Sequence, residues 1–274
     1  MKMILLTLLT ALCVLGFSSG DKMVQEPMKD LALVFEDNFD SLNTTYWTAG
    51  SLRDKASGDI VPGAKGAHLL GDQYDGYITA EDVYVEDGKL VLRNQKRDFQ
   101  GSDPEGDFDY TSGWVMSMHK LHMNKGYVEV RAQFPSGDKV WPAIWLISEN
   151  LVWCPEWDLF EYFGYRQGVG KDIMGNHLCH GAYPDQQWEE HWIRSFDATY
   201  QNEAWHTYGF EWTADKATWY IDEQEVHTLD ADSVAAWPDE DMYLVLNNGT
   251  RTEAPDTNTT WPNYLKIDYV RIYL

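Results

Sequence analysis

Hydrophobic and polar residues alternate in many short stretches along this chain, with a period of two residues. A β-strand points successive side chains to opposite faces, so this period predicts strands with one buried and one exposed face. Turn residues, such as Pro-Ser-Gly at 135–137, separate the stretches. No stretch has a sustained helical period. The predicted strands are 33–39, 77–85, 89–93, 113–118, 126–134, 143–148, 157–163, 174–180, 205–212, 217–221, 225–229, 242–247 and 265–273.

Many short strands at even spacing predict an all-β fold, either a sandwich of two antiparallel sheets or a barrel. The Asp-Gly pair at 87–88 predicts a tight hairpin between two of the strands. We expect loops at the more polar segments, which are 42–71, 97–109 and 182–196. Because the sequence contains no internal repeat and no linker, residues 32–274 are expected to form one domain.

The first residues have the features of an export signal. Lys2 is followed by an apolar run at 3–17 and by small residues at 18–20. We therefore predict a signal peptide at 1–20 and a flexible leader at 21–31. The apolar run is too short for a membrane-spanning helix, and no later stretch is long enough. A soluble secreted protein, extracellular or periplasmic, is the expected product.

The composition narrows the class of partner. The formal net charge is −23, which argues against nucleic acid and anionic membranes, because both are bound by basic patches. The chain has 13 Trp and 16 Tyr. Aromatic rings offer flat surfaces on which the C–H face of a sugar ring can stack. An acidic, Trp-rich, exported protein is therefore a reasonable carbohydrate binder.

Cleavage after residue 20 leaves two cysteines, Cys154 and Cys179. In an oxidising compartment the two can pair if residues 174–180 form a strand beside residues 157–163. Two buried free thiols fit the sequence equally well.

The densest chemistry lies at residues 155–164, which read Pro-Glu-Trp-Asp-Leu-Phe-Glu-Tyr-Phe-Gly. On a regular strand Glu156 and Asp158 share one face, and Glu161 falls on the other face. One extra residue at 159–160, a β-bulge, would return Glu161 to the face of the other two acids. Bulges are over-represented next to active sites, where they re-aim side chains.

Carboxylates that share one wall suit glycoside hydrolysis. One carboxylate attacks the anomeric carbon, and a protonated one donates to the leaving oxygen; in retaining enzymes the two lie about 5–5.5 Å apart. Crowded acids also push their pKa values apart. Taken alone, the stretch leaves open a plainer interpretation, which is an acidic, half-exposed edge strand.

Further stretches make the chain resemble glycoside hydrolase family 16, in the branch with a bulged catalytic strand that includes laminarinases, agarases and carrageenases. The motifs follow in order over most of residues 33–274. They are Gly-Tyr-Val-Glu-Val-Arg at 126–131, Trp-Pro-Ala-Ile-Trp-Leu at 141–146, the acidic stretch at 156–164, Trp-His-Thr-Tyr-Gly-Phe-Glu-Trp at 205–212, Trp-Tyr-Ile-Asp at 219–222, residues 243–248, and Asp-Tyr-Val-Arg-Ile-Tyr at 268–273.

The resemblance implies a β-jelly-roll sandwich with a concave substrate cleft and a retaining, endo-acting hydrolase. By position, Glu156 would be the nucleophile, Glu161 the general acid/base and Asp158 the assisting acid between them. Two residues depart from the usual pattern, in which Gly precedes the first Glu and a small aliphatic residue follows it. This chain has Pro155 and Trp157, which concern strand packing and bear on the substrate more than on the chemistry.

The resemblance favours a β-1,3- or mixed-linkage β-1,3/1,4-glucan as substrate. A marine galactan hydrolase of the agarase, porphyranase or carrageenase kind is the alternative. A non-catalytic polysaccharide-binding protein on the same sandwich is a further one, but it would need no acid pair.

Other positions are implied by the same resemblance. Trp141, Trp145, Trp114 and His180 would line the cleft and contact the substrate. No cofactor is expected for catalysis, and a structural calcium would involve Glu36 and Asp268. Polysaccharide is the expected partner of a monomeric protein.

Overall fold

The computed structural model describes residues 31–50, 74–102, 105–150 and 152–274. The predicted export signal at 1–20, nearly all of the leader at 21–31 and much of the loop at 42–71 lie outside these ranges. Among the helices of the described ranges, none has the length and apolar character needed to cross a membrane.

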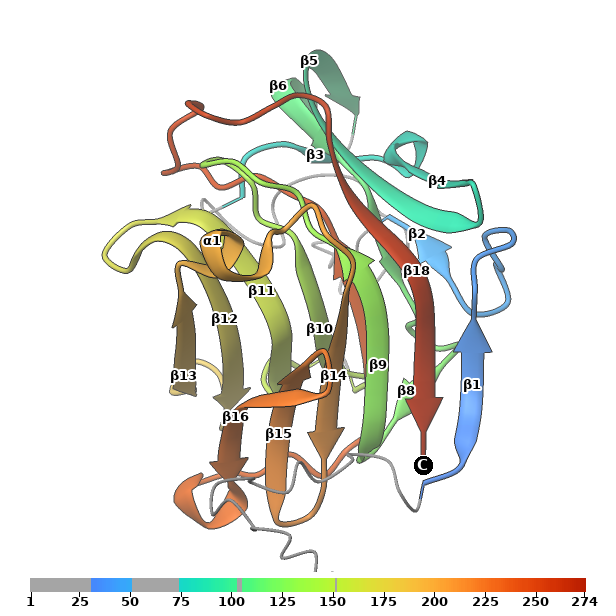
Figure 1. The fold of residues 1–274 in the computed structure, drawn as a ribbon, viewed down its shortest axis with the longest axis vertical. Helices are drawn as coiled ribbons and strands as arrows, with labels where there is room; N and C mark the ends of the chain where they lie inside the picture. The colour runs from blue at the N-terminus through green and yellow to red at the C-terminus, as the bar shows by residue number, and fades with distance from the viewer. Residues whose placement is uncertain (1–30, 51–73, 103–104, 151) are drawn as a thin grey trace, which may run out of the picture.

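Two β-sheets pack face to face, and Figure 1 shows the ten-stranded sheet nearer the viewer, with the eight-stranded sheet behind it. The ten-stranded sheet has the order β16 (Gln224–Asp230), β15 (Lys216–Ile221), β14 (His206–Trp212), β9 (Gly126–Gln133), β18 (Asn263–Tyr273), β5 (Lys89–Ser102), β6 (Glu105–Ser112) and β3 (Tyr77–Ile78), with β1 (Leu33–Asp37) against β18 and β4 (Val83–Glu86) against β5. The pairing is antiparallel except between β3 and β6.

The eight-stranded sheet has the order β13 (Gln187–Arg194), β12 (Gly170–His180), β11 (Glu156–Arg166), β10 (Ala143–Ser148), β17 (Met242–Asn247), β7 (Trp114–Met116) and β2 (Thr48–Ala49), with β8 (His122–Met123) against β17. Helical structure in the described residues is limited to α1 (Phe196–Tyr200), η2 (Ala80–Asp82) and η3 (Ala231–Ser233). The predicted all-β jelly-roll sandwich of two antiparallel sheets is confirmed.

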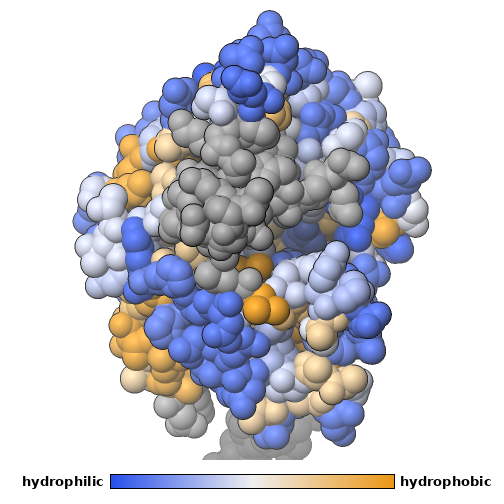
Figure 2. Space-filling view, turned by 180° about the vertical axis from the view of Figure 1, so that it is seen from behind, coloured by the Kyte–Doolittle hydropathy of each residue, from blue (hydrophilic) through white to orange (hydrophobic). Residues whose placement is uncertain are grey.

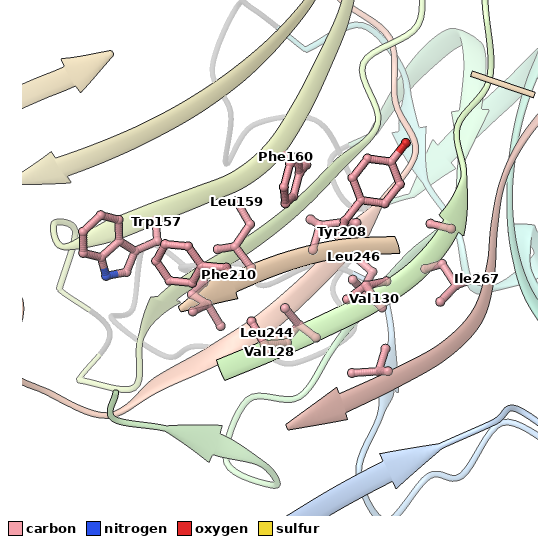
Figure 3. Packing of buried hydrophobic residues seen from close by; sticks show 14 of the residues in the cluster. Val128, Val130, Trp157, Leu159, Phe160, Tyr208, Phe210, Leu244, Leu246 and Ile267 are labelled. Atoms are coloured by element: carbon pink, nitrogen blue, oxygen red, sulfur yellow. The ribbon is translucent and has the colours of Figure 1, made fainter. Parts of the chain in front are cut away.

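The main core fills the space between the sheets. It is built from the inward side chains of both, and Figure 3 shows Val128 and Phe210 of the ten-stranded sheet facing Leu159 and Leu244 of the eight-stranded one. Trp157 is fully buried there and contacts four aromatic rings, at centroid distances of 5.2–6.1 Å: Phe210, Trp212, Trp219 and Trp237. The indole at position 157, a departure from the family pattern, therefore completes an aromatic cluster in the core.

The predicted bulge is present in β11. Between Asp158 and Glu161 this strand advances by three residues, while its partner β12 advances by only two, from His177 to Gly175. Leu159 and Phe160, which are adjacent in sequence, both point into the core (Figure 3). The extra residue therefore returns Glu161 to the face that carries Asp158, as the sequence predicts.

Three predictions about local structure were wrong. Residues 97–109, expected as a loop, belong mostly to β5 and β6, which pair as a long hairpin. Much of the expected loop at 182–196 is strand β13. The single strand expected at 77–85 is instead broken into β3, η2 and β4. The tight hairpin at Asp87-Gly88 is confirmed, because β4 and β5 pair directly across these two residues, both of which have positive φ.

We expect Trp157→Ala to lower the free energy of unfolding by about 3–5 kcal/mol, since it removes a buried indole and leaves a cavity. Trp157→Phe should lower it much less, because a ring remains and the indole N–H has no hydrogen-bond partner among the described residues. Urea unfolding measures both. Leu33→Ala, at a half-exposed position, is the control and should change stability by less than about 0.5 kcal/mol. Equal losses for Ala and Phe would contradict the packing argument.

Candidate active site

The acids lie on the face of the eight-stranded sheet that points away from the core, which we call the outer face. Residues that oppose each other on neighbouring strands share a face, so the strand register places them in three cross-strand rows. From β17 to β13 the rows read Tyr243, Ile147, Glu156, Cys179 and Trp188; Val245, Trp145, Asp158, His177 and Glu190; and Asn247, Ala143, Glu161, Gly175 and Trp192. Each row therefore carries one of the three predicted acids near its centre.

Glu161 is held by neighbours that also lie on the outer face. Its Oε1 accepts a hydrogen bond from Trp141 Nε1 at 2.6 Å, and its Oε2 lies 3.9 Å from His177 Nε2. His177 is the residue that opposes Asp158 across β11 and β12. Glu161 and Asp158 therefore face the same space, which is the arrangement that a pair of acids acting on one bond requires.

Glu156 is held from the segment that precedes β11. Its Oε2 accepts a hydrogen bond from Trp153 Nε1 at 3.1 Å. The next residue, Cys154, forms a disulfide with Cys179, which lies beside Glu156 on β12. Of the two possibilities that the sequence left open for the cysteines, the structure therefore has the bridge, and the bridge ties Trp153 to the strand next to the acid.

Burial dominates the electrostatics of the three acids. Burial and the charge of Glu161 raise the pKa of Glu156 to about 8, against the opposing effect of the Trp153 N–H. Burial, with the charges of Glu161 and Glu156, raises the pKa of Asp158 well above its usual range. Desolvation disfavours a charged carboxylate, and like charges nearby add to the effect. The trio therefore retains protons at a pH where isolated carboxylic acids have lost them.

The environment of Glu161 differs from that of the other two acids. Burial raises its pKa as well, but Arg166, the Trp141 N–H and Arg251 all act to lower it. The Arg166 guanidinium lies 4.9 Å from the ring centres of both Phe163 and Trp192. Positive charge is thus concentrated at the Glu161 end of the site, in a protein whose net charge is −23.

His177 is a buried group of this site that the sequence did not single out. Its ring contacts Trp192 at a centroid distance of 4.3 Å and leans over Gly175, where a Cβ atom would collide with its Nε2. Burial lowers its pKa to about 3, so the imidazole is neutral near neutral pH. Neither ring nitrogen has a hydrogen-bond partner among the described residues.

The predicted tryptophans of the cleft all lie on the outer face. Trp141 bonds Glu161, and Trp145 stands in the row of Asp158 and donates from Nε1 to Asn247 Oδ1 at 2.7 Å. Trp114 lies beside Trp145, with the ring centroids 6.0 Å apart, and is itself buried against Tyr74. Trp141 and Trp145 are therefore the partly accessible rings of this group, and Trp114 supports them.

His180 does not join the acids, contrary to the sequence-based prediction. The side chains of β12 alternate, and since His177 points to the outer face, His180 points to the opposite one. It is buried there, and its Nε2 lies 3.2 Å from Glu189 Oε1. The histidine that faces the site is His177.

The predicted calcium ligands do not converge either. Glu36 opposes Arg271 and accepts a hydrogen bond from its Nε at 2.7 Å, whereas Asp268 is paired with Lys89 at 2.7 Å and with Arg131. Calcium requires several oxygen ligands around one point. Because both carboxylates are occupied by different basic side chains, this pair does not fit a calcium ion. Among the described residues, no group of three or more His, Cys, Asp or Glu side chains could hold a metal.

Several residues of the site were missed by sequence reasoning. Trp153 lies in the segment before β11, Trp192 on β13 and Arg166 at the end of β11 itself, and no local pattern marks them. The exception is His177, whose face could have been inferred: a disulfide assumed across adjacent strands pairs Cys154 with Cys179 and so puts His177 on the face of the acids, although two residues from its actual place opposite Asp158.

Comparison with known proteins adds independent findings. The profile described as "Glycosyl hydrolases family 16" matches residues 70–271. Glucan endo-1,3-beta-glucosidase A1 of Niallia circulans is 30% identical over 71% of this chain and 31% of its own length, and endo-1,3-1,4-beta-glycanase EglC of Rhizobium meliloti (strain 1021) is 26% identical over 89% and 52%. The chain thus spans between about a third and a half of these curated relatives.

A solved structure resembles the whole sandwich. The laminarinase catalytic domain from Thermotoga maritima MSB8 superposes with a TM-score of 0.71 at 27% identity, over 89% of this chain and 98% of that domain. The likeness therefore includes both sheets and is not confined to the acidic strand.

We expect Glu156→Gln to be more stabilising at pH 9 than at pH 5. The raised pKa of Glu156 means that its contribution to stability is fully present below the unfolded-state value near 4.5 and is lost as the pH rises through about 8. The amide carries no charge and avoids this loss. Thermal unfolding at the two pH values should show the gain of the variant increasing by at least about 2 °C at pH 9. Glu225→Gln, at an exposed site, is the control and should show no such increase. A constant difference at both pH values would contradict the raised pKa.

Proposed function

The chain belongs to glycosyl hydrolases family 16, and on that premise we propose that it is an endo-acting β-glycanase that cleaves with retention of anomeric configuration. The observation that carries the proposal is the bulge in β11, which brings Glu161 to the face of Glu156 and Asp158. Two glutamates that flank a third acid on one wall supply both groups that a retaining hydrolase needs.

In the first step, Glu161 in its acid form donates its proton to the glycosidic oxygen, while the Glu156 carboxylate attacks the anomeric carbon. The bond from that carbon to the leaving oxygen breaks, and a covalent glycosyl-enzyme ester forms at Glu156. The Trp141 N–H, 2.6 Å from Glu161 Oε1, fixes the orientation of the acid and stabilises the carboxylate that remains after the proton has left.

In the second step, Glu161 acts as a base. It takes a proton from water, the water oxygen attacks the anomeric carbon, and the ester bond to Glu156 breaks. Two inversions at the same carbon give net retention. The Trp153 N–H, 3.1 Å from Glu156 Oε2, stabilises Glu156 as it regains its negative charge. Each of the two glutamates thus has its own indole donor.

Asp158 holds a proton in this scheme. Its pKa is raised well above the usual range, so the carboxyl can donate a hydrogen bond to a neighbouring acid. The protons of three coupled acids belong to the group, not to one residue. A proton on Glu161 removes one of the two causes that raise the pKa of Glu156, so Glu156 ionises more easily when Glu161 is in its acid form.

The opposite division of roles has one observation in its favour. Without substrate, Arg166 and Arg251 act to lower the pKa of Glu161, which favours the anion there and the proton on Glu156. The family resemblance supports Glu156 as the nucleophile, and the electrostatics of the free site support Glu161. An experiment that reads the configuration of a trapped product separates the two.

The proposed substrate is a β-1,3- or mixed-linkage β-1,3/1,4-glucan. The names of the compared proteins support it, since they include a glucan endo-1,3-beta-glucosidase, an endo-1,3-1,4-beta-glycanase and a laminarinase. No cofactor takes part in the proposed reaction, and calcium at Glu36 and Asp268 is left out of it. Export by residues 1–20 and the monomeric state stay predictions.

We expect the wild-type protein to release oligosaccharides from laminarin and barley β-glucan, and much less from agarose or carrageenan. Reducing-sugar release over this panel measures the preference. Glu156→Ala should abolish turnover but retain binding of laminarin, because stacking and hydrogen bonding by the rest of the site survive. Hydrolysis of agarose or carrageenan instead would identify the protein as a galactan hydrolase. Binding without turnover in the wild-type protein would favour a non-catalytic role.

We expect azide to rescue the two glutamate variants differently. With an activated aryl β-glycoside of laminaribiose, azide in Glu156→Gly should attack the sugar from the vacated side and give an α-glycosyl azide. In Glu161→Gly, azide should instead displace Glu156 from the glycosyl-enzyme and give the β-azide. Without azide, Glu161→Gly should lose roughly 10²–10⁴-fold of its activity on laminarin. Product NMR reads the configuration, and the reverse pattern would exchange the roles of the two acids.

A further inference from the structure

We propose that Trp153, Tyr183 and Trp188 form a stacking platform for a neutral sugar ring, and that this platform extends the substrate site from Glu156 toward β13. We call these three residues the edge platform. The inference deepens the proposed glycanase function and rests on it, because it states where the glycan runs beyond the bond that is cleaved.

Exposure of apolar side chains first points to this place. Of the large hydrophobic residues that are exposed in the described part of the chain, Val152, Tyr183 and Trp188 gather here, with exposed fractions of 61%, 67% and 40%. The Trp153 ring joins them, since its centroid lies 5.9 Å from that of Tyr183 and 6.1 Å from that of Trp188. Exposed apolar residues that form one patch commonly mark a binding site.

The position of the platform relates it directly to the acids. Trp188 on β13 stands in the same row as Cys179 and Glu156, so all three point to the outer face. Two strand spacings of about 4.8 Å place the backbone of Trp188 about 10 Å from that of Glu156. This distance is of the order of a disaccharide. The hydrogen bond from the Trp153 N–H to the Glu156 carboxylate links the platform directly to the proposed nucleophile.

One ring of the platform, Trp153, is also held in place before any ligand arrives. The Cys154–Cys179 disulfide fixes the segment next to Trp153 against β12, and the Glu156 carboxylate holds the indole N–H from the other side. Aromatic rings have few rotatable bonds, so an ordered ring binds a ligand at a low cost in conformational entropy. An exposed ring without such contacts would lose more conformational entropy on binding a ligand.

Charge decides which kind of sugar suits the site. The outer face of β13 carries Trp188, Glu190 and Trp192, so a carboxylate follows the platform along the strand. Among the described residues, Arg166 is the basic side chain that pairs with Glu190, at 3.8 Å, and it lies toward Glu161. A sulfated or carboxylated ring on Trp188 would meet the carboxylate of Glu190, with which Arg166 is already paired. The platform therefore suits an uncharged ring, whose C–H face stacks on the indole.

Figure 2 shows the side of the molecule that lies behind in Figure 1, to which the outer face belongs. Hydrophobic residues lie there in separate groups among hydrophilic ones, and one of these groups is near the middle.

The test is the dependence of hydrolysis on chain length. In the disulfide-bonded full chain, Tyr183→Ala with Trp188→Ala should lower kcat/KM about tenfold on laminarihexaose, and by a clearly smaller factor on laminaritriose, because only the longer chain reaches the platform. Val34→Ala, which removes an exposed apolar residue from β1 of the other sheet, is the matched control and should change neither value. An equal loss at both lengths, or no loss on the hexaose, would overturn the proposal.

A binding experiment keeps the platform separate from the proposed catalysis. Glu156→Gln serves as an inactive background, into which the Tyr183→Ala and Trp188→Ala changes are introduced. Calorimetric titration with laminarihexaose should show affinity about tenfold weaker when both rings are removed. If the wild-type protein hydrolyses no β-glucan, the glycanase proposal fails, but this loss of affinity would still support the platform. Unchanged affinity, binding only of sulfated carrageenan oligosaccharides, or no binding of laminarihexaose at all would overturn it.

Discussion

The site depends on a packing constraint within one strand. If β11 alternated regularly, Glu161 would point into the core and Phe160 would point out of it, so a carboxylate would be buried without a partner and an aromatic ring would be exposed. Either error costs several kcal/mol. One extra residue avoids both, because Leu159 and Phe160 then enter the core together and Glu161 faces outward. The hydrophobic effect that assembles the sandwich therefore also sets the position of the acid.

Burial of three acids on one wall opposes stability, and the surroundings offset it only in part. Single donors hold Glu156 and Glu161, from Trp153 and Trp141 respectively, while positive charge from Arg166 and Arg251 acts at the Glu161 end. A full ion pair at each acid would be more stabilising, but it would also keep the acid ionised. Sites that must exchange protons are commonly less stable than they could be, and the rest of the fold compensates. Here the aromatic core around Trp157 supplies that compensation.

The sequence allowed the acidic strand to be predicted and left much of its surroundings open, for a physical reason. The bulge could be inferred because its cause is local: three acids and two adjacent apolar residues cannot all be satisfied by strict alternation. The neighbours come from strand register, which joins β11 to β12 and β13 across distant parts of the chain. The resemblance indicates His180, whereas the register places His177 at the site. Strand β13 does not stand out in the sequence because its polar residues mask its alternation.

The calcium site predicted at Glu36 and Asp268 does not fit for a related reason. A resemblance indicates which positions correspond to those of the family, but it does not show which side chains each residue contacts in this protein. The two carboxylates form ion pairs with different basic residues on neighbouring strands, so they do not converge on one point where a cation could bind. The same limit applies to the long hairpin of β5 and β6. In its outer part, residues 97–109, the apolar side chains Phe99 and Phe108 stand among polar and charged residues, too few to give the alternation by which a strand is usually recognised.

Tryptophan serves two purposes in this protein, packing in the core and holding side chains on the outer face. In the core, the N–H groups of Trp157, Trp212 and Trp219 have no hydrogen-bond partner among the described residues, so these rings contribute volume and apolar surface. On the outer face, Trp141, Trp145 and Trp153 each donate to an acid or an amide. A ring that donates from its edge keeps its orientation while one face can stay available for stacking. The outer tryptophans thus combine control of the acids with a surface suited to a sugar, which Phe at the same positions would not provide.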